Sequence, residues 1–447
     1  MDRSVTYTVR GSLGNERVDG TLWLYIACLL SGILYSVTHL AVLGIVTTLA
    51  ICTFLLVSSQ EESYIFLFGM QFMRAVIPVQ LGSSAFGFIL FAYAILLLKM
   101  FYYREKLYGE YLAVGILFMA DLVGCAYTNI LHIGDTVNWV LSLIYMILVL
   151  KGSLKSIDFE RLVIFFLLAE WAVCLVNVFT ELSLFGQTLV PEMYGVWVDG
   201  FDLYAFGKSY PTIAGGNEIA FSNALGIALC IMMWRYAKKT RTKVFYFFSI
   251  LFFAYTGIML IARAFYVELL LFLVLYILCS IKDLHRFAVT LCILGLCGIV
   301  FYFVAYDAVL VTLERVLLRF EAGNVTRENL LAQSFQLLSS DVGIFLHGGG
   351  TYYPEKFGFT AHNHYVDAFL SLGLLSEVLY LAVIIKTMYG ALRRNRVRSL
   401  KACLPLIMLV TYKFISGSVR DVGFYFYLSM VVVFAVYMTG REEHGRA

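Results

Sequence analysis

Long apolar stretches recur along the whole chain, and they restrict its fold more than any other feature. A helix needs about 20 predominantly apolar residues to cross the hydrocarbon core of a membrane. Of the 447 residues, 61% are hydrophobic and only 14% are charged, whereas an ordinary soluble domain has about 25% charged residues. Lipid offers the backbone no hydrogen-bond partners, so each stretch is expected to be a helix. The sequence therefore predicts an all-α, polytopic transmembrane helical bundle.

The apolar stretches predict 12 to 14 spans. One candidate, residues 64–81, has the length of a span but contains Arg74, Pro78 and two glutamines. Such residues are costly in hydrocarbon, so this segment either faces the protein interior or lies partly in the interface. The other spans are expected near residues 22–37, 39–57, 84–100, 111–131, 137–150, 161–180, 217–235, 244–262, 264–281, 286–304, 365–388, 401–419 and 423–439.

Short basic connections predict the orientation, because cytoplasmic loops carry an excess of Lys and Arg. Four such connections, at residues 151–161, 235–243, 282–286 and 393–401, are separated by even numbers of spans, so all four can be cytoplasmic. Counting residues 64–81 as a span gives 14 spans with both ends inside. If that segment is re-entrant, there are 13 and the N-terminus is outside. The first reading divides the chain into a cytoplasmic tail (1–21), a helical region (22–305) with an outer loop (181–216), a second outer loop (306–364), C-terminal helices (365–439) and a cytoplasmic tail (440–447).

Charge, cysteines and missing motifs exclude several functions. The formal net charge of +3 gives no reason to expect a nucleic-acid partner. The nine cysteines lie almost wholly in apolar runs, without a Cys-x-x-Cys pair, and are interpreted as packing residues. No Gly-rich loop ending in Lys-Ser or Lys-Thr is present, so ATP hydrolysis is not expected. No Asp-x-Asp pair lies in an outer loop and the histidines lack zinc-ligand spacing, so no metal or other cofactor is expected.

The outer loop 306–364 is the expected location of any chemistry, since loops longer than about 12–15 residues are usually functional or disordered. Residues 309–320 and 328–338 have apolar positions at helical spacing and predict two amphipathic helices over the membrane surface. Three glycines then break the helix before a turn through Pro354. Histidine suits proton transfer and arginine grips phosphate oxygens. The loop carries both, at Arg315, Arg319, Arg327, His347, His362 and His364.

The sharpest local feature is the run from Thr360 to Asp367, TAHNHYVD, which leads directly into the apolar helix expected at 365–388. It places His362 at the outer entrance of that helix, close to an arginine-rich loop. The alternative is that His362 and Asn363 only cap the helix, since Asn is a favoured N-cap residue. Both interpretations stay open from the local sequence.

Five more residues at outer or intramembrane positions are candidates. Arg263 ends one span and begins the next, so it either extends to the interface or contacts a ligand phosphate. Asn217 and Glu218 stand at the outer start of a helix, where Asn217 can act as a cap. Arg420 can pair weakly with its neighbour Asp421 in the last outer turn. Arg74, in a candidate span, needs an anionic partner or a phosphate.

Taken together, these residues resemble the O-antigen polymerase and ligase superfamily. The resemblance covers the order and topology of most of the chain. Its moderately specific part is a His-Asn pair followed by nine residues and a glycine, here His362, Asn363 and Gly373. The arginine-bearing loop, the Gly-Asn-Glu-x-Ala start at 216–220 and Arg263 add to it. Two departures are Ala262, where the family often has Ser, and Ser376, where ligases commonly have Thr.

The resemblance implies a glycosyltransferase on the outer face of a bacterial cytoplasmic (inner) membrane. Its donor would be an undecaprenyl-diphosphate-linked oligosaccharide, and its partners would include membrane lipid and can include a chain-length regulator protein. His362 would activate the acceptor hydroxyl, and Arg263 and Arg327 would bind the diphosphate. The wider set of substrate-binding candidates comprises Arg315, Arg319, Asn363, Asn217, Glu218, Arg74 and Arg420.

Two alternatives accompany this prediction. A ligase would transfer polymer to a lipid A core, whereas a polymerase would extend another lipid-linked repeat unit, and the polymerase is preferred because the loop and chain length are ordinary for it. A flippase or other transporter would catalyse no reaction. Transporters place charges near the membrane midplane and often contain repeats. The polar residues here concentrate in one outer loop and no internal repeat is visible, so the enzyme is preferred.

Overall fold

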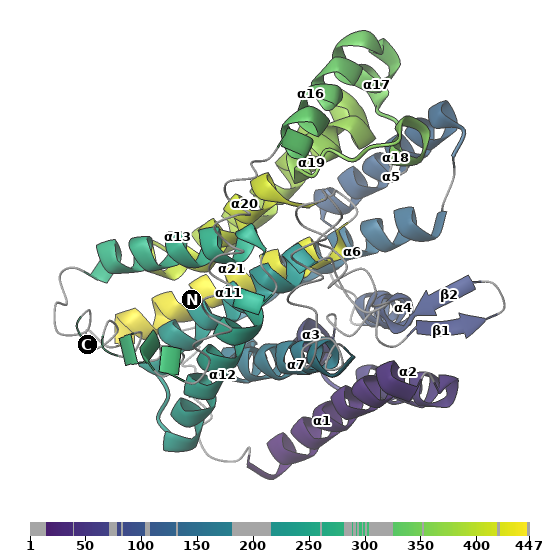
Figure 1. Cartoon of the computed structure of the whole chain (residues 1–447). Coiled ribbons are helices and arrows are strands. Elements are labelled where there is room, and N and C mark those ends of the chain that lie inside the picture. Colours follow the sequence, from purple (N-terminus) through teal and green to yellow (C-terminus); the bar gives the residue numbers. More distant parts are fainter. Residues whose placement is uncertain are drawn as a thin grey trace, which may run out of the picture.

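The computed structural model shows a chain that is helical nearly throughout (Figure 1). It describes residues 15–38, 40–70, 78–81, 84–102, 108–130, 133–180, 216–259, 262–280, isolated positions between 288 and 303, and residues 325–350, 353–417 and 421–444. The long elements are α1 Asn15–Thr38, α2 Ala41–Val57, α3 Gln60–Met70, α4 Phe88–Tyr102, α5 Gly109–Thr128, α6 Ile133–Lys151, α7 Phe159–Thr180, α11 Gly216–Trp234, α12 Thr240–Met259, α13 Arg263–Ser280, α16 Val325–Ser340, α19 His364–Arg394, α20 Leu404–Ile415 and α21 Val422–His444. The short elements are β1 Pro78–Leu81, β2 Ser84–Gly87, the single-turn η2 Leu154–Ser156, α17 Val342–His347, α18 Tyr353–Phe357 and η3 Lys401–Cys403.

The helices have the length and composition of membrane spans, so the chain is a helical membrane protein. Four segments are long and apolar enough to cross a bilayer: Gly109–Thr128, Arg263–Ser280, His364–Arg394 and Gly423–Arg441. Five shorter apolar helices accompany them, within α1, α2, α4, α6 and α11. Most expected spans coincide with an observed helix to within a few residues. The count of 12 to 14 spans stays a prediction.

A short β-hairpin stands between α3 and α4 in the otherwise helical chain. α3 ends at Met70, and β1 pairs antiparallel with β2, with Pro78 opposite Gly87 and Leu81 opposite Ser84. Residues 64–81 are therefore not one continuous helix, and the span expected from residue 84 begins at Phe88. Pro78 has no N–H and is tolerated at the first position of a strand. A Gly-Ser pair stands between Leu81 and Ser84, a sequence typical of a two-residue hairpin loop.

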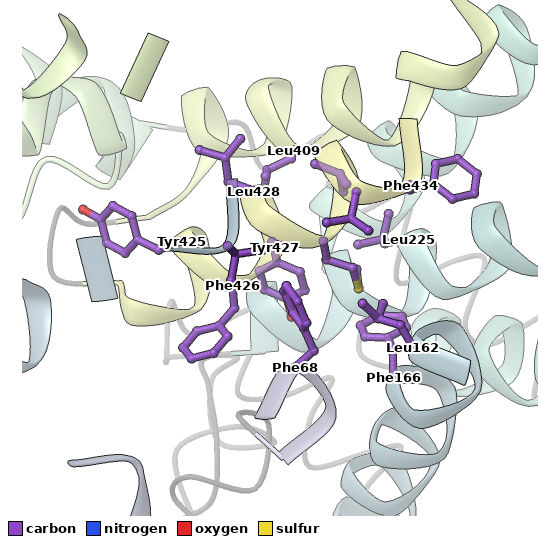
Figure 2. Packing of buried hydrophobic residues seen from close by; sticks show 14 of the residues in the cluster. Phe68, Leu162, Phe166, Leu225, Leu409, Tyr425, Phe426, Tyr427, Leu428 and Phe434 are labelled. Carbon is purple, nitrogen blue, oxygen red and sulfur yellow. The ribbon is translucent and has the colours of Figure 1, made fainter. Parts of the chain in front are cut away.

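The core of the bundle forms around α21. From Phe424 to Val436 its side chains are buried on every side, which is typical of a helix surrounded by others. Figure 2 shows Tyr425 to Phe434 of α21 next to Phe68 of α3, Phe166 of α7 and Leu409 of α20. Segments far apart in the sequence thus meet on the last helix of the chain. Phe221 of α11 also stacks on Tyr412 of α20, with ring centroids 4.3 Å apart.

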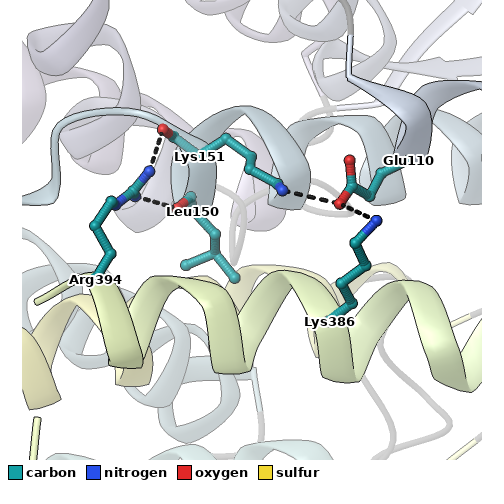
Figure 3. Close-up of polar contacts among 5 residues, drawn as sticks. All are labelled: Glu110, Leu150, Lys151, Lys386 and Arg394. Atoms are coloured by element: carbon teal, nitrogen blue, oxygen red, sulfur yellow. Dashed lines mark hydrogen bonds and ion pairs between the residues drawn. The ribbon is translucent and has the colours of Figure 1, made fainter. Parts of the chain in front are cut away.

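One end of the bundle, here called the basic end, collects the predicted cytoplasmic connections. Arg394 at the end of α19 donates hydrogen bonds to the carbonyl oxygens of Leu150 and Lys151 (Figure 3), and also to that of Gly152. Lys401 donates to Ser280 at the end of α13. The connection between α11 and α12 borders a cavity shared with the start of α7 and the end of α21. Three of the four basic connections therefore lie at one end, as predicted, and the fourth lies outside the described residues.

The opposite end carries α16, α17 and α18, which cluster beside the first part of α19 and the end of α5 (Figure 1). We call these three helices, with residues 358–363, the lid. The amphipathic helix predicted at 328–338 lies within α16, and the one predicted at 309–320 lies outside the described residues. Pro354 stands in the first turn of the short α18, where proline is tolerated, so the turn predicted there is a helix start.

Candidate active site

The lid has a small hydrophobic core of its own. Leu338, Ile344, Tyr353 and Leu370 are buried together, separate from the main core of the bundle. Leu370 belongs to α19, so this core joins the lid to the helix that begins after His362. The residues that precede α19 are therefore held by packing on both sides.

Three glycines make the seam between the lid and the membrane helices. Gly348, with φ of 76°, ends α17, as the sequence predicts. Gly349 and Gly350 then donate backbone hydrogen bonds to the carbonyl oxygens of Leu370 and Ser371, at 2.8 and 2.9 Å. These carbonyls become available because α19 is interrupted at Gly373, whose φ and ψ of 73° and 172° are not helical. The seam is thus a contact between main chains, which only glycine permits.

A buried tyrosine–aspartate pair fixes the turn that carries His362. The Tyr353 hydroxyl donates to Asp367 Oδ1 at 2.7 Å, and the backbone N–H of Ala361 donates to the same hydroxyl at 3.2 Å. Asp367 and Tyr353 are almost fully buried. Because a buried and fully engaged hydroxyl leaves little freedom, the backbone next to His362 is held in one place.

The cap interpretation is confirmed for Asn363. Asn363 is the N-cap of α19, and its side chain accepts from the N–H groups of Tyr365 and Val366 and donates to the carbonyl of Phe414 at 3.0 Å. His362 is exposed, and its backbone has φ of 50°. A non-glycine residue in this region is uncommon. An exposed histidine therefore stands directly before the N-cap of α19.

His364 begins a buried chain of hydrogen bonds that the sequence did not indicate. Its Nε2 shares a hydrogen bond of 2.7 Å with the hydroxyl of Tyr380, which lies 2.9 Å from that of Tyr425. Trp139 Nε1 donates to the Tyr425 hydroxyl at 2.7 Å. All four side chains are buried, so this chain ties α19, α21 and α6 together directly below the lid. Sequence spacing gave no signal, because the partners lie up to 286 residues apart.

The buried Lys413 is the second feature that the sequence analysis missed. It lies inside the apolar α20, its side chain is fully buried, and its Nζ pairs with Asp421 Oδ2. Asp421 therefore pairs with Lys413. Arg420, which the sequence suggested as a weak partner of Asp421, lies outside the described residues. Gly417 places the turn after α20 against Lys413 and the Cβ of His364. The side chain of Lys413 is therefore held close to His364.

The other candidate residues whose side chains the structure describes, Arg263 and Glu218, lie at the lid end. Ser280 contacts Lys401 at the basic end, and α13 packs on α20, so Arg263 at the start of α13 lies at the lid end. Arg263 is half-buried, as is Glu218 in the first turn of α11. Asn217 lies in α11 and Arg327 in α16, but neither side chain is among those described. Arg74, Arg315 and Arg319 lie outside the described residues.

Carboxylates inside the bundle form a further set that the sequence analysis did not single out. Glu170 is fully buried and accepts a hydrogen bond of 2.6 Å from Ser222. Glu268 is also fully buried, and neither of its carboxyl oxygens has a hydrogen-bond partner among the described residues. Ionisable residues inside a membrane bundle are rare and usually functional. They are considered below with the competing function.

Asp341 links the lid to α5. Its side chain caps α17 by accepting from the N–H groups of Gly343 and Ile344. The single hydroxyl hydrogen of Tyr127 is shared between the two carboxylate oxygens of Asp341, at 2.9 and 3.1 Å. Partial burial raises the pKa of Asp341, but the bonds from Ile344, Tyr127 and Gly343 lower it more, so the net pKa lies below the ordinary range. The carboxylate is therefore the form that holds the lid on α5. Nowhere in the described part of the chain do three His, Cys, Asp or Glu side chains come close enough to hold a metal ion.

These features define a class: a helical membrane protein with an ordered lid at one end, an exposed histidine just before a helix, and a buried lysine, Lys413, close to His364. Comparison of the chain with protein-family models, with curated proteins and with solved structures found no match in any of the three.

Proposed function

We propose that this chain is a membrane glycosyltransferase that polymerises undecaprenyl-diphosphate-linked oligosaccharide repeat units into O-antigen or a capsular or exopolysaccharide. The lid would face the outer side of a bacterial cytoplasmic membrane. The observation that carries the proposal is the exposed His362, held by the Tyr353–Asp367 pair and by the Asn363 cap at the lid end. The basic connections at the other end support this orientation.

The reaction would proceed in one displacement. His362 takes the proton of the acceptor hydroxyl, whose oxygen bonds to the anomeric carbon of the donor sugar as the bond from that carbon to the phosphate oxygen breaks. The electron pair leaves with the diphosphate, and Arg263 and Arg327 stabilise its charge. Proton removal of this kind contributes roughly 10²- to 10⁴-fold to a rate.

The rigidity around His362 supports a role in catalysis. A general base must be within hydrogen-bond reach of the proton it removes, and misplacement is costly. The turn before α19 is fixed by a buried hydroxyl, a helix cap and the lid core, while the imidazole itself stays accessible. A histidine with only a packing role has no need of this exposure.

Transfer by purified protein is the direct test, with lipid-linked repeat unit as both donor and acceptor and with a parallel reaction in chelator. His362→Asn is the preferred variant, because Asn tolerates the left-handed backbone that His362 adopts. We expect its rate to fall by roughly 10²-fold or more, with normal membrane insertion. His347→Asn is the matched control, since His347 lies in the same lid but packs its ring against Tyr127. A His362→Asn protein with the parental rate would exclude this residue as the base.

The product identifies the acceptor. A ladder of lengthening polymer indicates a polymerase, whereas transfer of preformed polymer to a lipid A core indicates a ligase. Arg263→Ala is expected to weaken use of the donor while insertion stays normal. An unchanged rate would mean that Arg263 only extends to the interface.

The buried carboxylates favour one competing function, a transporter of lipid-linked oligosaccharide. Glu170 and Glu268 lie inside helices of the bundle, where transporters place their functional charges. In that case Glu170→Gln or Glu268→Gln would stop movement of the lipid-linked unit across the membrane, and His362→Asn would leave it unchanged. Loss of polymer length with intact export in His362→Asn favours the enzyme.

A further inference from the structure

A cavity of about 450 Å³ lies at the basic end, far from the lid. It is formed where the start of α7, the end of α11, the connection to α12 and the end of α21 come together. Leu22 in α1 closes one side. Its volume is within the range of small-molecule sites, about 300–1,000 Å³.

Cations outnumber acids in the wall of this cavity. Arg161, Lys238, Lys239 and Arg441 line it, against Asp158 and Glu160. Both acids are already engaged. Asp158 accepts a hydrogen bond from the backbone N–H of Arg161 at the start of α7. Glu160 accepts a hydrogen bond from the hydroxyl of Tyr437 and forms an ion pair with Arg441.

Arg161 is the residue that points to a ligand. Its Nε and Nη2 atoms are buried and have no hydrogen-bond partner in the described part of the protein, while its guanidinium lies 5.3 Å from the centre of the Phe165 ring. Buried donors are nearly always satisfied, so an unpaired guanidinium edge is costly unless an acceptor fills the site. Two adjacent N–H groups in one plane suit a bidentate phosphate.

The rest of the wall indicates which phosphate compounds fit. Leu22, Ile164, Phe165 and Met233 give the cavity an apolar side, and Lys238 and Lys239 stand exposed at its rim. The cavity lies where several apolar helices begin or end, at the level expected for headgroups. An amphiphile would place its phosphate on the cations and its chains along the apolar wall.

We propose that this cavity is a binding site for a phosphate group, carried by an anionic phospholipid of the surrounding leaflet or by a soluble phosphate. Arg161 grips the phosphate oxygens, and Lys238 and Lys239 add charge at the entrance. The site is independent of the lid and of the proposed glycosyl transfer. Its occupation joins α1, α7, α12 and α21 at the basic end, so it stabilises the folded bundle by mass action.

Thermal unfolding of the full-length protein in neutral detergent tests this site, with phosphatidylglycerol, a zwitterionic phosphatidylcholine or inorganic phosphate added in separate titrations. We expect phosphatidylglycerol to raise the Tm of the parent protein. Arg161→Gln is expected to weaken the apparent affinity about tenfold, since losing charge-assisted hydrogen bonds of about 1.5–3 kcal/mol gives at least that factor. The double variant Lys238→Gln/Lys239→Gln is expected to weaken it less, and it keeps the test valid if Arg161→Gln does not fold.

The matched control is Arg241→Gln, because Arg241 is exposed in the first turn of α12, two residues after Lys239, but does not line the cavity. An Arg161-dependent response to inorganic phosphate alone supports the site with a soluble source, and a response to phosphatidylglycerol alone supports the lipid source. The proposal is overturned if both cavity variants respond like the parent, if Arg241→Gln loses as much as Arg161→Gln, or if phosphatidylcholine acts as well as phosphatidylglycerol.

Discussion

The two ends of the bundle hold charge in different ways. At the lid end, one fully buried cation, Lys413, is matched with Asp421. At the basic end, Glu110 binds two lysines, Lys151 at 2.8 Å and Lys386 at 3.2 Å, and the side chain of Lys386 is 72% exposed (Figure 3). The buried Lys413 ammonium depends on a carboxylate to balance its charge, whereas the shared carboxylate of Glu110 keeps one lysine if the other is lost. The difference indicates that the lid end is built for fixed geometry and the basic end tolerates change.

The largest loss of stability is expected on substitution of Lys413. Lys413→Met removes the fully buried member of the Lys413–Asp421 pair, and removing one member of a buried pair costs about 3–5 kcal/mol. Lys386→Ala breaks an exposed pair of which Glu110 keeps the other half, so a cost of about 0–1 kcal/mol is expected. The unfolding midpoints of both variants in the same detergent measure the difference between their losses of stability. Equal midpoints would remove the distinction between the two ends.

The second prediction concerns the glycine seam. A Cβ on Gly348 would overlap the carbonyl of Ser371, whereas Gly358 has the same φ of 76° and nothing within 4 Å. In both Ala variants the left-handed backbone conformation costs about 1–3 kcal/mol. Only Gly348→Ala also separates the lid from α19. We therefore expect Gly348→Ala to be the more destabilising by at least about 1 kcal/mol, with the difference seen as faster protease cleavage in the lid. Matching cleavage rates would show that the seam is not a tight contact.

The smallest effect is expected at Asp341 and depends on pH. Because the folded state lowers the pKa of Asp341, the carboxylate stabilises the lid fully above the ordinary pKa of an aspartate, about 3.9. That contribution is lost as the pH falls further, through the pKa of the folded protein. Asp341→Asn retains a capping side chain but has nothing to titrate.

The measurement for Asp341 is lid stability between pH 7 and pH 3, followed by protease cleavage or by the fluorescence of a label on the lid. The parent protein should lose more lid stability than Asp341→Asn over this interval. Two parallel curves would mean that another group holds the lid. At pH 7 the cap itself is expected to contribute about 1 kcal/mol, which Asp341→Ala reveals.

The sequence predicted the large elements because they depend on local composition. Apolar length located nearly all the described membrane helices, and the excess of Lys and Arg placed three basic connections together. It left residues 64–81 open, and part of that segment pairs with residues 84–87 in a hairpin, so the span expected from residue 84 begins at Phe88. Length and hydropathy alone do not distinguish those outcomes.

The candidate site was predictable only in part, for a physical reason. His362 and Asn363 are neighbours at a helix start, so a local motif could locate them. Lys413 looked like one polar residue in an apolar run, and the His364–Tyr380–Tyr425–Trp139 chain joins three helices. Contacts made only by tertiary packing leave no spacing to detect in one sequence.

The two hydrogen bonds of the seam allow the opening of the lid to be measured at its own backbone amides. The N–H groups of Gly349 and Gly350 are bonded to carbonyls of α19 and not to their own helix, so their deuterium uptake measures how often the lid lifts from the bundle. A substrate that closes the lid would slow that uptake at two known amides, without any label and without altering a side chain.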